Sequence, residues 1–179
     1  FYANAAGTGF SQTCTDSGGD GICDSAYTIA TNNIDSLPIA LNTNPVSACG
    51  SLSTVNSLYD LTGAVSGTGT CINITASNVT LDCHGYSIRY ATTGRGNGVF
   101  VHKNVNLATI KNCVIQTPAT STAQNYAVYF THDSFNATLK DSTILTNGTS
   151  DNYGVYVYSS KNHTIQGNTI RTRCSGTCT

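Results

Sequence analysis

Short stretches in which apolar and polar residues alternate recur along the chain from about residue 70 onward. Each contains a Thr followed by Leu or Ile, and the shared residues are Thr80, Thr109, Thr138 and Thr164, which lie 29, 29 and 26 residues apart. A second alternating stretch precedes each Thr, at 72–74, 99–101, 128–130 and 155–157. Alternation with a period of two is typical of a β-strand with one buried face.

Strands that recur at this spacing, with no helical pattern between them, predict stacking of one repeat on the next. One inward column would hold Leu81, Ile110, Leu139 and Ile165, and another would hold Ile88, Ile115, Ile144 and Ile170. The pattern therefore predicts an all-β chain that forms a right-handed parallel β-helix, or solenoid, of about four rungs. The corner between the two columns supports this prediction, because Asn112, Asp141 and Gly167 share one position and all tolerate the left-handed backbone conformation. In the first rung the run 82–87 is two residues longer, so a different turn is expected there.

Residues 74–88 resemble the opening rung of the right-handed β-helix repeat proteins, the pectate-lyase-like solenoids, and are most similar to secreted archaeal and related microbial members. Residues 48–54 and 69–74 resemble the cap and first strand of those proteins. The resemblance covers roughly residues 47–172 and implies the fold. It leaves function open, because the family includes lyases, hydrolases, accessory proteins and surface proteins.

The N-terminal stretch resembles a segment that closes such solenoids, as in the nitrous-oxide-reductase accessory β-helix proteins. The similarity lies in residues 16–24, 27–29, 32–35 and 37–38. Here this segment precedes the opening cap, which is a permuted order. We therefore predict two regions, a loop-rich segment at 1–46 and a capped β-helix at 47–179.

The composition indicates an extracellular or cell-surface protein. Only 9% of the residues are charged, all nine acidic residues are Asp, and the net charge is −1, which provides no basic field for nucleic acid. No membrane span is expected. Eight cysteines indicate an oxidising compartment, and their spacing does not fit zinc. The expected disulfides are Cys14–Cys23, Cys49–Cys71, Cys83–Cys113 and Cys174–Cys178.

Catalysis is not expected. The carboxylates inside the repeats are Asp82, Asp133 and Asp141, and no Asp recurs in one column, so the paired carboxylates of a glycosidase or the Asp cluster of a β-helix lyase are not predicted. His102 and His163 also fall at different repeat positions and predict no histidine column. The sequence therefore predicts no hydrolase or lyase activity on acidic polysaccharides.

Three candidate binding features remain, each with an alternative interpretation. Asp16, Asp20 and Asp24 form a Gly-rich run that is suited either to Ca²⁺ or to an Asx-bonded turn, and no other cofactor is expected. N-glycosylation sequons begin at Asn73, Asn78, Asn136, Asn147 and Asn162. Three of these, Asn78, Asn136 and Asn162, share an outward column that carries either glycans or an Asn/Thr ladder. If the alternate valines point inward, Phe100, Tyr129 and Tyr156 form an outward stripe that binds sugars or protein, or that reflects strand preference alone.

The function that we expect from the sequence is structural. The residues that follow the last rung are expected to be too few and too polar to cover its apolar side chains. The segment that resembles a closing segment lies at the opposite terminus. Both features are explained if the segment of one copy closes the last rung of another, because a head-to-tail contact that does not form a ring builds a filament or surface layer. The same order would arise in one period of a longer repetitive chain, and the segment can also fold back onto its own last rung. The alternatives are a polysaccharide-binding module and a polysaccharide lyase or hydrolase.

Overall fold

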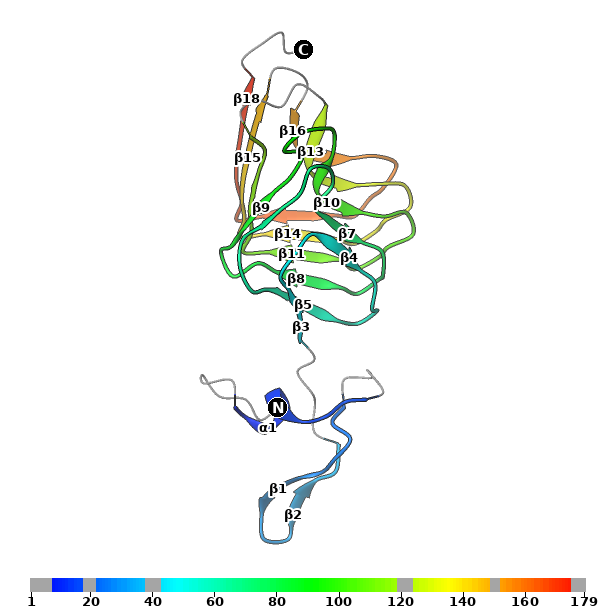
Figure 1. Ribbon diagram of the computed structural model, residues 1–179. Helices are drawn as coiled ribbons and strands as arrows, with labels where there is room; N and C mark the ends of the chain where they lie inside the picture. The colour runs from blue at the N-terminus through cyan, green and yellow to red at the C-terminus, as the bar shows by residue number, and fades with distance from the viewer. Residues whose placement is uncertain (1–7, 18–21, 38–42, 119–123, 149–151, 175–179) are drawn as a thin grey trace. The chain divides into compact units, whose positions relative to one another are not determined.

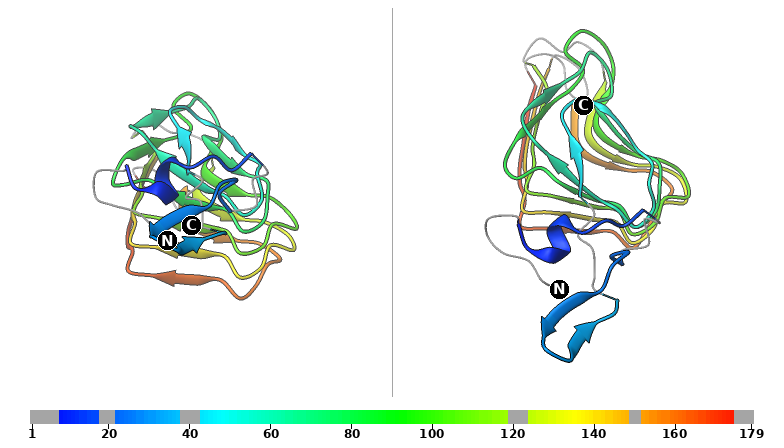
Figure 2. Two further views of the ribbon diagram at one scale, coloured as in Figure 1. Left: turned by 90° about the horizontal axis from the view of Figure 1, so that it is seen from below. Right: turned by 60° about the horizontal axis from the view of Figure 1, so that its bottom comes forward.

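The computed structural model describes residues 8–17, 22–37, 43–118, 124–148 and 152–174. The chain divides into two units, Phe1–Thr43 and Asn44–Thr179. The larger unit is a parallel β-solenoid of about four turns with a short capping turn, as the repeat predicts. Three sheets surround one apolar core, and strands at the same position in successive turns lie side by side (Figures 1 and 2).

Every complete turn contributes one strand to each sheet. The first sheet has the order β16-β13-β10-β7-β4. Its strands are β4 (Gly50–Leu52), β7 (Ile72–Ile74), β10 (Asn97–Val101), β13 (Asn125–Phe130) and β16 (Asn152–Val157).

The second sheet has the order β17-β14-β11-β8-β5-β3. Its strands are β3 (Thr43–Val46), β5 (Leu58–Leu61), β8 (Thr80–Asp82), β11 (Thr109–Lys111), β14 (Thr138–Lys140) and β17 (Thr164–Gln166). The third sheet has the order β18-β15-β12-β9-β6. Its strands are β6 (Val65–Ser66), β9 (Ser87–Arg89), β12 (Val114–Gln116), β15 (Thr143–Gly148) and β18 (Thr169–Cys174).

The register confirms both predicted inward columns. Leu81, Ile110, Leu139 and Ile165 pair in succession across the second sheet. Ile88, Ile115, Ile144 and Ile170 pair in the same way across the third. All except the members of the last turn are completely buried. Burying an aliphatic side chain of this size contributes roughly 1.5–3 kcal/mol, so the two columns are a main source of stability.

The corners of the solenoid are formed by residues with a left-handed backbone. Asn112, Asp141 and Gly167 have φ values of 55°, 52° and 66°, as predicted. The longer first turn differs, because His84 and Gly85 both have positive φ there. A second corner, which was not predicted, has one left-handed residue in each of five turns. These residues are Asn56, Asn78, Leu107, Asn136 and Asn162, with φ between 56° and 63°.

The smaller unit is built around a disulfide and a hairpin. The short helix α1 (Phe10–Thr13) is followed by Cys14, which is bonded to Cys23. The strands β1 (Tyr27–Ala30) and β2 (Asn33–Asp35) pair antiparallel, and the rings of Phe10 and Tyr27 lie 4.7 Å apart. The hairpin region leaves three apolar side chains exposed, which are Ile29, Ile34 and Leu37.

Leu107 is the residue at the second corner whose type does not suit its backbone. A left-handed conformation costs most L-residues roughly 1–2 kcal/mol, whereas Asn adopts it readily. The Leu107 side chain is 53% exposed, so little burial is lost on replacing it. We expect Leu107→Asn to raise the free energy of unfolding by about 1 kcal/mol in denaturant titrations.

The variant should be made in a host without N-glycosylation, because it creates a new sequon, Asn-Ala-Thr. Leu107→Ala is the matched control, since it removes the same side chain but keeps the unfavourable backbone conformation. Equal or lower stability of Leu107→Asn relative to the wild type would contradict this account of the corner.

Candidate functional site

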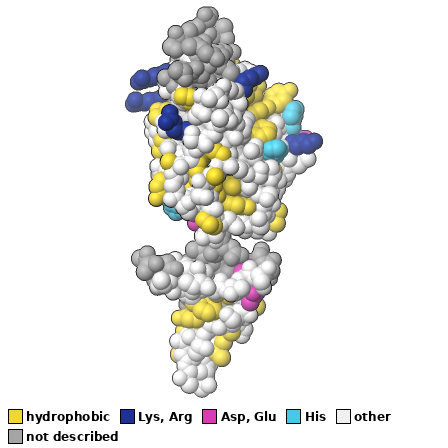
Figure 3. Space-filling model, viewed as in Figure 1, with side chains coloured by type: hydrophobic (Ala, Val, Ile, Leu, Met, Phe, Trp, Pro, Cys, Tyr) yellow, Lys and Arg dark blue, Asp and Glu magenta, His cyan; other side chains and the backbone are white. Residues whose placement is uncertain are grey.

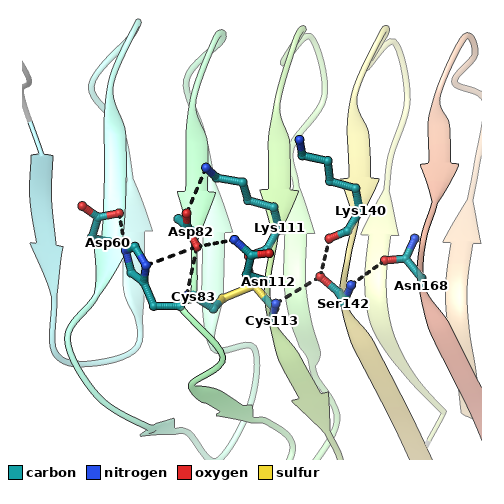
Figure 4. The surroundings of a disulfide bond; sticks show 10 residues. Asp60, Asp82, Cys83, Lys111, Asn112, Cys113, Lys140, Ser142 and Asn168 are labelled. Carbon is teal, nitrogen blue, oxygen red and sulfur yellow. Dashed lines mark hydrogen bonds and ion pairs between the residues drawn. A yellow bond between two sulfur atoms is a disulfide. The ribbon is translucent and has the colours of Figure 1, made fainter. Parts of the chain in front are cut away.

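A column of ionisable side chains runs along the outward face of the second sheet. Asp60 of β5 pairs in register with Asp82 of β8, which pairs with Lys111 of β11 and then Lys140 of β14. These strands alternate, so the residues that flank the buried Leu81, Ile110 and Leu139 all point to the same side. Figure 4 shows the column beside the Cys83–Cys113 disulfide.

The two carboxylates of this column are held by donors from two turns. Asp82 Oδ1 accepts hydrogen bonds from the His84 backbone N–H and from Asn112 Nδ2, both at 3.0 Å. Lys111 Nζ lies 2.9 Å from Asp82 Oδ2, and His84 Nε2 lies 2.9 Å from Asp60 Oδ1. Both oxygens of Asp82 are therefore occupied by donors of this chain.

The Asp82 carboxylate is buried but remains ionised. Burial acts to raise the pKa of Asp82, but the hydrogen bonds from Asn112 and His84 and the ammonium of Lys111 outweigh burial and lower the pKa below its usual value. A depressed pKa in the folded state stabilises the protein at pH values above the unfolded pKa, and this contribution is lost as the pH falls through the folded pKa.

The expectation that no carboxylates would share a column is wrong. That expectation rested on the Asp positions within the four repeats alone. Asp60 lies before them, in the capping turn, and is the register partner of Asp82. The ligand atoms of Asp60, Asp82 and His84 all lie within 4.8 Å of one another, a donor set that suits a divalent metal ion. Lys111 already neutralises Asp82, however, so in this arrangement the four side chains stabilise one another.

Three of the predicted disulfides form. These are Cys14–Cys23, Cys49–Cys71 and Cys83–Cys113, whereas Cys178 of the fourth pair lies outside the described residues. The position of Cys113 is taken in later turns by Ser142 and Asn168. Ser142 Oγ accepts from the Cys113 N–H at 3.1 Å, and Asn168 Oδ1 accepts from the Ser142 N–H at 2.9 Å (Figure 4). Hydrogen bonds thus continue along the corner that the disulfide begins.

The outward face of the first sheet carries clustered aromatic rings. Phe100, Tyr129 and Tyr156 pair in register on successive turns, and the ring centroids of each neighbouring pair lie 5.2 Å apart. Tyr126 and Tyr153 form a second row, 5.4 Å apart, and Tyr126 stacks on Tyr156 at 4.6 Å. We call these five residues the aromatic surface. His102 lies against Phe100 at its edge, at 4.5 Å.

The second row was not predicted, because strict alternation from Val128 places Tyr126 on the inward face. In β13 both Ala127 and Val128 are buried, so Tyr126 and Tyr129 both point outward. Small residues in the column Gly98, Ala127 and Gly154 make this arrangement possible. A Cβ on Gly98 would lie 2.3 Å from Ile115 Cγ2, and one on Gly154 would lie 2.6 Å from Ile170 Cγ2. The Gly-Val and Ala-Val pairs are the sequence signal for the second row.

The two ends of the solenoid differ. In the capping turn the inward side chains that occupy the same three columns, Leu52, Tyr59 and Val65, are at most 8% exposed, and Val46 of β3 is also buried. In the last turn each sheet exposes an inward apolar residue: Val157 by 43%, Ile165 by 45% and Ile170 by 43%. We call these three residues the open end. β16, β17 and β18 are also the edge strands of their sheets.

The remaining predicted residues are dispersed. In the N-terminal unit Asp24 Oδ2 accepts from the side chain and backbone of Ser17 at 2.7 and 3.0 Å, and these bonds lower the pKa of Asp24. Asp20 lies outside the described residues, so calcium binding stays a prediction. His163 stacks on Phe130 at 4.5 Å, and burial lowers its pKa.

The five sequons lie in three settings. Asn78, Asn136 and Asn162 are exposed at the second left-handed corner, where Asn78 Nδ2 donates to Asn56 Oδ1. Asn147 lies in the third sheet, where its N–H donates to Thr117 Oγ1. Asn73 lies in the first sheet and pairs in register with Phe100 of the aromatic surface.

Searches against protein-family models, curated proteins and solved structures find no match for this chain. Among the described residues, no helix has the length and apolar character needed to cross a membrane. The three disulfides are consistent with an oxidising compartment.

The ion network around Asp82 makes a prediction about stability. We expect Asp82→Asn to lower the free energy of unfolding at pH 7 by about 2 kcal/mol, since it removes the partner of Lys111 and places an amide among donors. Because the pKa of Asp82 is depressed, the wild type should lose part of this advantage as the pH falls below about 4. Denaturant titrations at pH 7 and pH 3 measure both effects.

Asp141→Asn is the matched control, because Asp141 is an exposed corner residue and Asn suits the same left-handed backbone. All variants are made in a host without N-glycosylation, since Asp141→Asn creates the sequon Asn-Ser-Thr. A loss of stability for Asp141→Asn equal to that for Asp82→Asn, or a difference between Asp82→Asn and the wild type that is the same at both pH values, would contradict the network.

Proposed function

We propose that this protein is an extracellular structural protein that assembles head-to-tail, with the N-terminal unit of one copy covering the open end of the next. The observation that carries the proposal is the contrast between the two ends of one solenoid, since equivalent inward residues are buried at the first end and nearly half exposed at the last. Exposed edge strands over apolar side chains favour pairing with another chain.

The N-terminal unit has exposed apolar side chains that could pack against those of the open end. Ile29, Ile34 and Leu37 are 48%, 57% and 71% exposed in and beside the β1–β2 hairpin. A hairpin can add backbone hydrogen bonds to an edge strand while its apolar side chains cover the last turn. Its resemblance to the closing segment of β-helix proteins supports the same role.

The charges of the two surfaces are complementary. Residues 1–43 contain four Asp and no Lys, Arg or His. The last turn, residues 152–174, contains Lys161, Arg171 and Arg173 and no acidic residue. Figure 3 shows basic side chains on the solenoid and acidic ones on the visible face of the N-terminal unit. Opposite charges increase the rate of association and select the partner.

A head-to-tail contact of this kind repeats from copy to copy. Because the two surfaces belong to different parts of the chain, the contact is heterologous and produces a filament unless it closes into a ring. The low charge and hydrogen-bonding surface of the solenoid, together with its disulfides, suit an exposed extracellular structure.

Substitution at the open end tests this proposal. We expect Ile165→Asp to raise the concentration at half-assembly by about tenfold or more, equivalent to at least ~1.4 kcal/mol, because a carboxylate would be buried at the contact. Sedimentation velocity and negative-stain microscopy measure the assembly. Assembly of the wild type should also weaken as salt rises, since the screening length falls from about 10 Å at 0.1 M to about 3 Å at 1 M.

Val55→Asp is the control, because Val55 is 56% exposed in the turn after β4, away from the open end. Deletion of residues 1–42, which leaves β3 intact, should also abolish assembly and leave the far-ultraviolet spectrum of the solenoid unchanged. The proposal would be contradicted if the wild type stayed monomeric at high concentration and its residues 22–37 were protected from hydrogen exchange by its own last turn.

The aromatic surface favours a second candidate function, binding of a polysaccharide. The five strands of the first sheet contain no Asp, Glu, Lys or Arg, so the surface suits an uncharged ligand. Tyrosine rings offer an apolar face to the C–H groups of a sugar and a hydroxyl to its polar edge.

Affinity electrophoresis in gels that contain a neutral polysaccharide such as mannan tests this second function. For chain made without N-glycosylation, we expect retardation to fall several-fold in Tyr126→Thr. Tyr126 contacts three other rings, and the substitution removes both one sugar-binding ring and these three contacts, each of which contributes about 0.5–1.5 kcal/mol to holding the surface in place. Tyr86→Thr is the control, since Tyr86 is exposed in the longer corner turn. Retardation that is absent, or equal in all three proteins, argues against this function.

A further inference from the structure

The row of rings that begins at Phe100 is preceded by a sequon. Along the outward face of the first sheet the register runs from Ser51 to Asn73 and then to Phe100, Tyr129 and Tyr156. Asn73 therefore lies one turn before three aromatic residues that occupy its own position on the next three turns. This juxtaposition is independent of the contacts at the two ends of the solenoid.

We propose that Asn73 carries an N-linked glycan and that its sugar rings lie along Phe100, Tyr129 and Tyr156. The bond forms between the Asn73 amide nitrogen and the anomeric carbon of a sugar delivered by a diphosphate-linked lipid donor. The amide loses a proton, and the lipid diphosphate leaves. The occupant of the aromatic surface is then part of this protein and not a soluble polysaccharide.

The setting of Asn73 differs from that of the other four sequons. Asn78, Asn136 and Asn162 have left-handed backbones with φ of 56°, 56° and 63°, so the corner itself explains their residue type. Asn147 also lies within a strand, β15 of the third sheet, but its register partner is Arg173 and not an aromatic residue. Asn73 lies mid-strand in β7, points outward between the buried Ile72 and Ile74, and in the described part of the chain its amide has no hydrogen-bond partner.

The geometry of the row suits a chain of sugars that begins at this position. Phe100, Tyr129 and Tyr156 follow one another at 5.2 Å between centroids, a spacing close to the length of one hexose unit in an extended chain. On the opposite side Asn73 is followed by Ser51, so the rings lie in one direction only. A glycan attached at the first position therefore meets one aromatic ring on each of three turns.

Two physical effects favour this contact over a glycan that extends into solvent. The rings of the aromatic surface contact one another, so they are held in place before the sugar arrives and few side-chain motions are lost. Covalent attachment at Asn73 also makes the contact intramolecular, which gives the sugars a high effective concentration at the rings. Stacking that would be weak for a free monosaccharide is sufficient under these conditions.

A double-mutant cycle in chain secreted from an N-glycosylating host tests the inference. Glycopeptide mass spectrometry should find Asn73 occupied. The midpoint of thermal unfolding should be about 2–4 °C lower in Asn73→Gln than in the wild type. In a Tyr129→Thr background, Asn73→Gln should leave the midpoint nearly unchanged, because the sugars have lost their central contact.

Asn147→Gln is the matched control, since its effect on the midpoint should be the same with and without Tyr129→Thr. The wild type, Asn73→Gln, Tyr129→Thr and the double variant, all made without glycosylation, should show no coupling between Asn73 and Tyr129. An unoccupied Asn73 overturns the inference, and so does a midpoint shift for Asn73→Gln that is unchanged by Tyr129→Thr. Neither result bears on head-to-tail assembly, which is measured by sedimentation and not by unfolding.

Discussion

A turn of this solenoid buries its inward side chains only where another turn covers it. Leu139 and Ile165 occupy the same column, one turn apart, yet Leu139 is fully buried and Ile165 is 45% exposed. At the first end β3 and Val46 supply the missing cover. The stability of the stack thus comes from contacts between neighbouring turns, and the ends are the places where a further chain segment gains most by binding.

The same stacking restricts the backbone at each corner, and this restriction explains many of the Asn residues. A chain that bends at the same point in every turn needs one left-handed residue there, and Asn supplies it in four of the five positions at the second corner. Three sequons begin at this corner, so their Asn residues are required by the backbone whether or not they are modified. Asn73 has no such backbone reason, which is why its place before the aromatic row is informative.

The repeat alone predicts the parallel stack, its inward columns and the first left-handed corner, because these follow from alternation and from equal steps between the shared Thr residues. The Asp60–Asp82 pair could not be predicted in this way. Asp60 lies in a capping strand, Leu58–Leu61, that lacks the shared Thr and is 22 residues from its partner instead of 26 to 29. The outward positions of Tyr126 and Tyr153 depend on small residues beside Val128 and Val155, which break the alternation.

Stacking in register converts one outward residue per turn into a row parallel to the solenoid axis. Because the inward positions of all turns meet the same requirement, only the outward positions are free to differ between sheets. The second sheet carries the acidic and basic column, the first carries uncharged rings, and the third ends with Arg171 and Arg173. A row of equivalent groups with a repeat of about 4.8 Å contacts an extended ligand at several points together. The lateral faces are therefore suited to linear chains such as glycans, whereas the ends are suited to other copies of the protein.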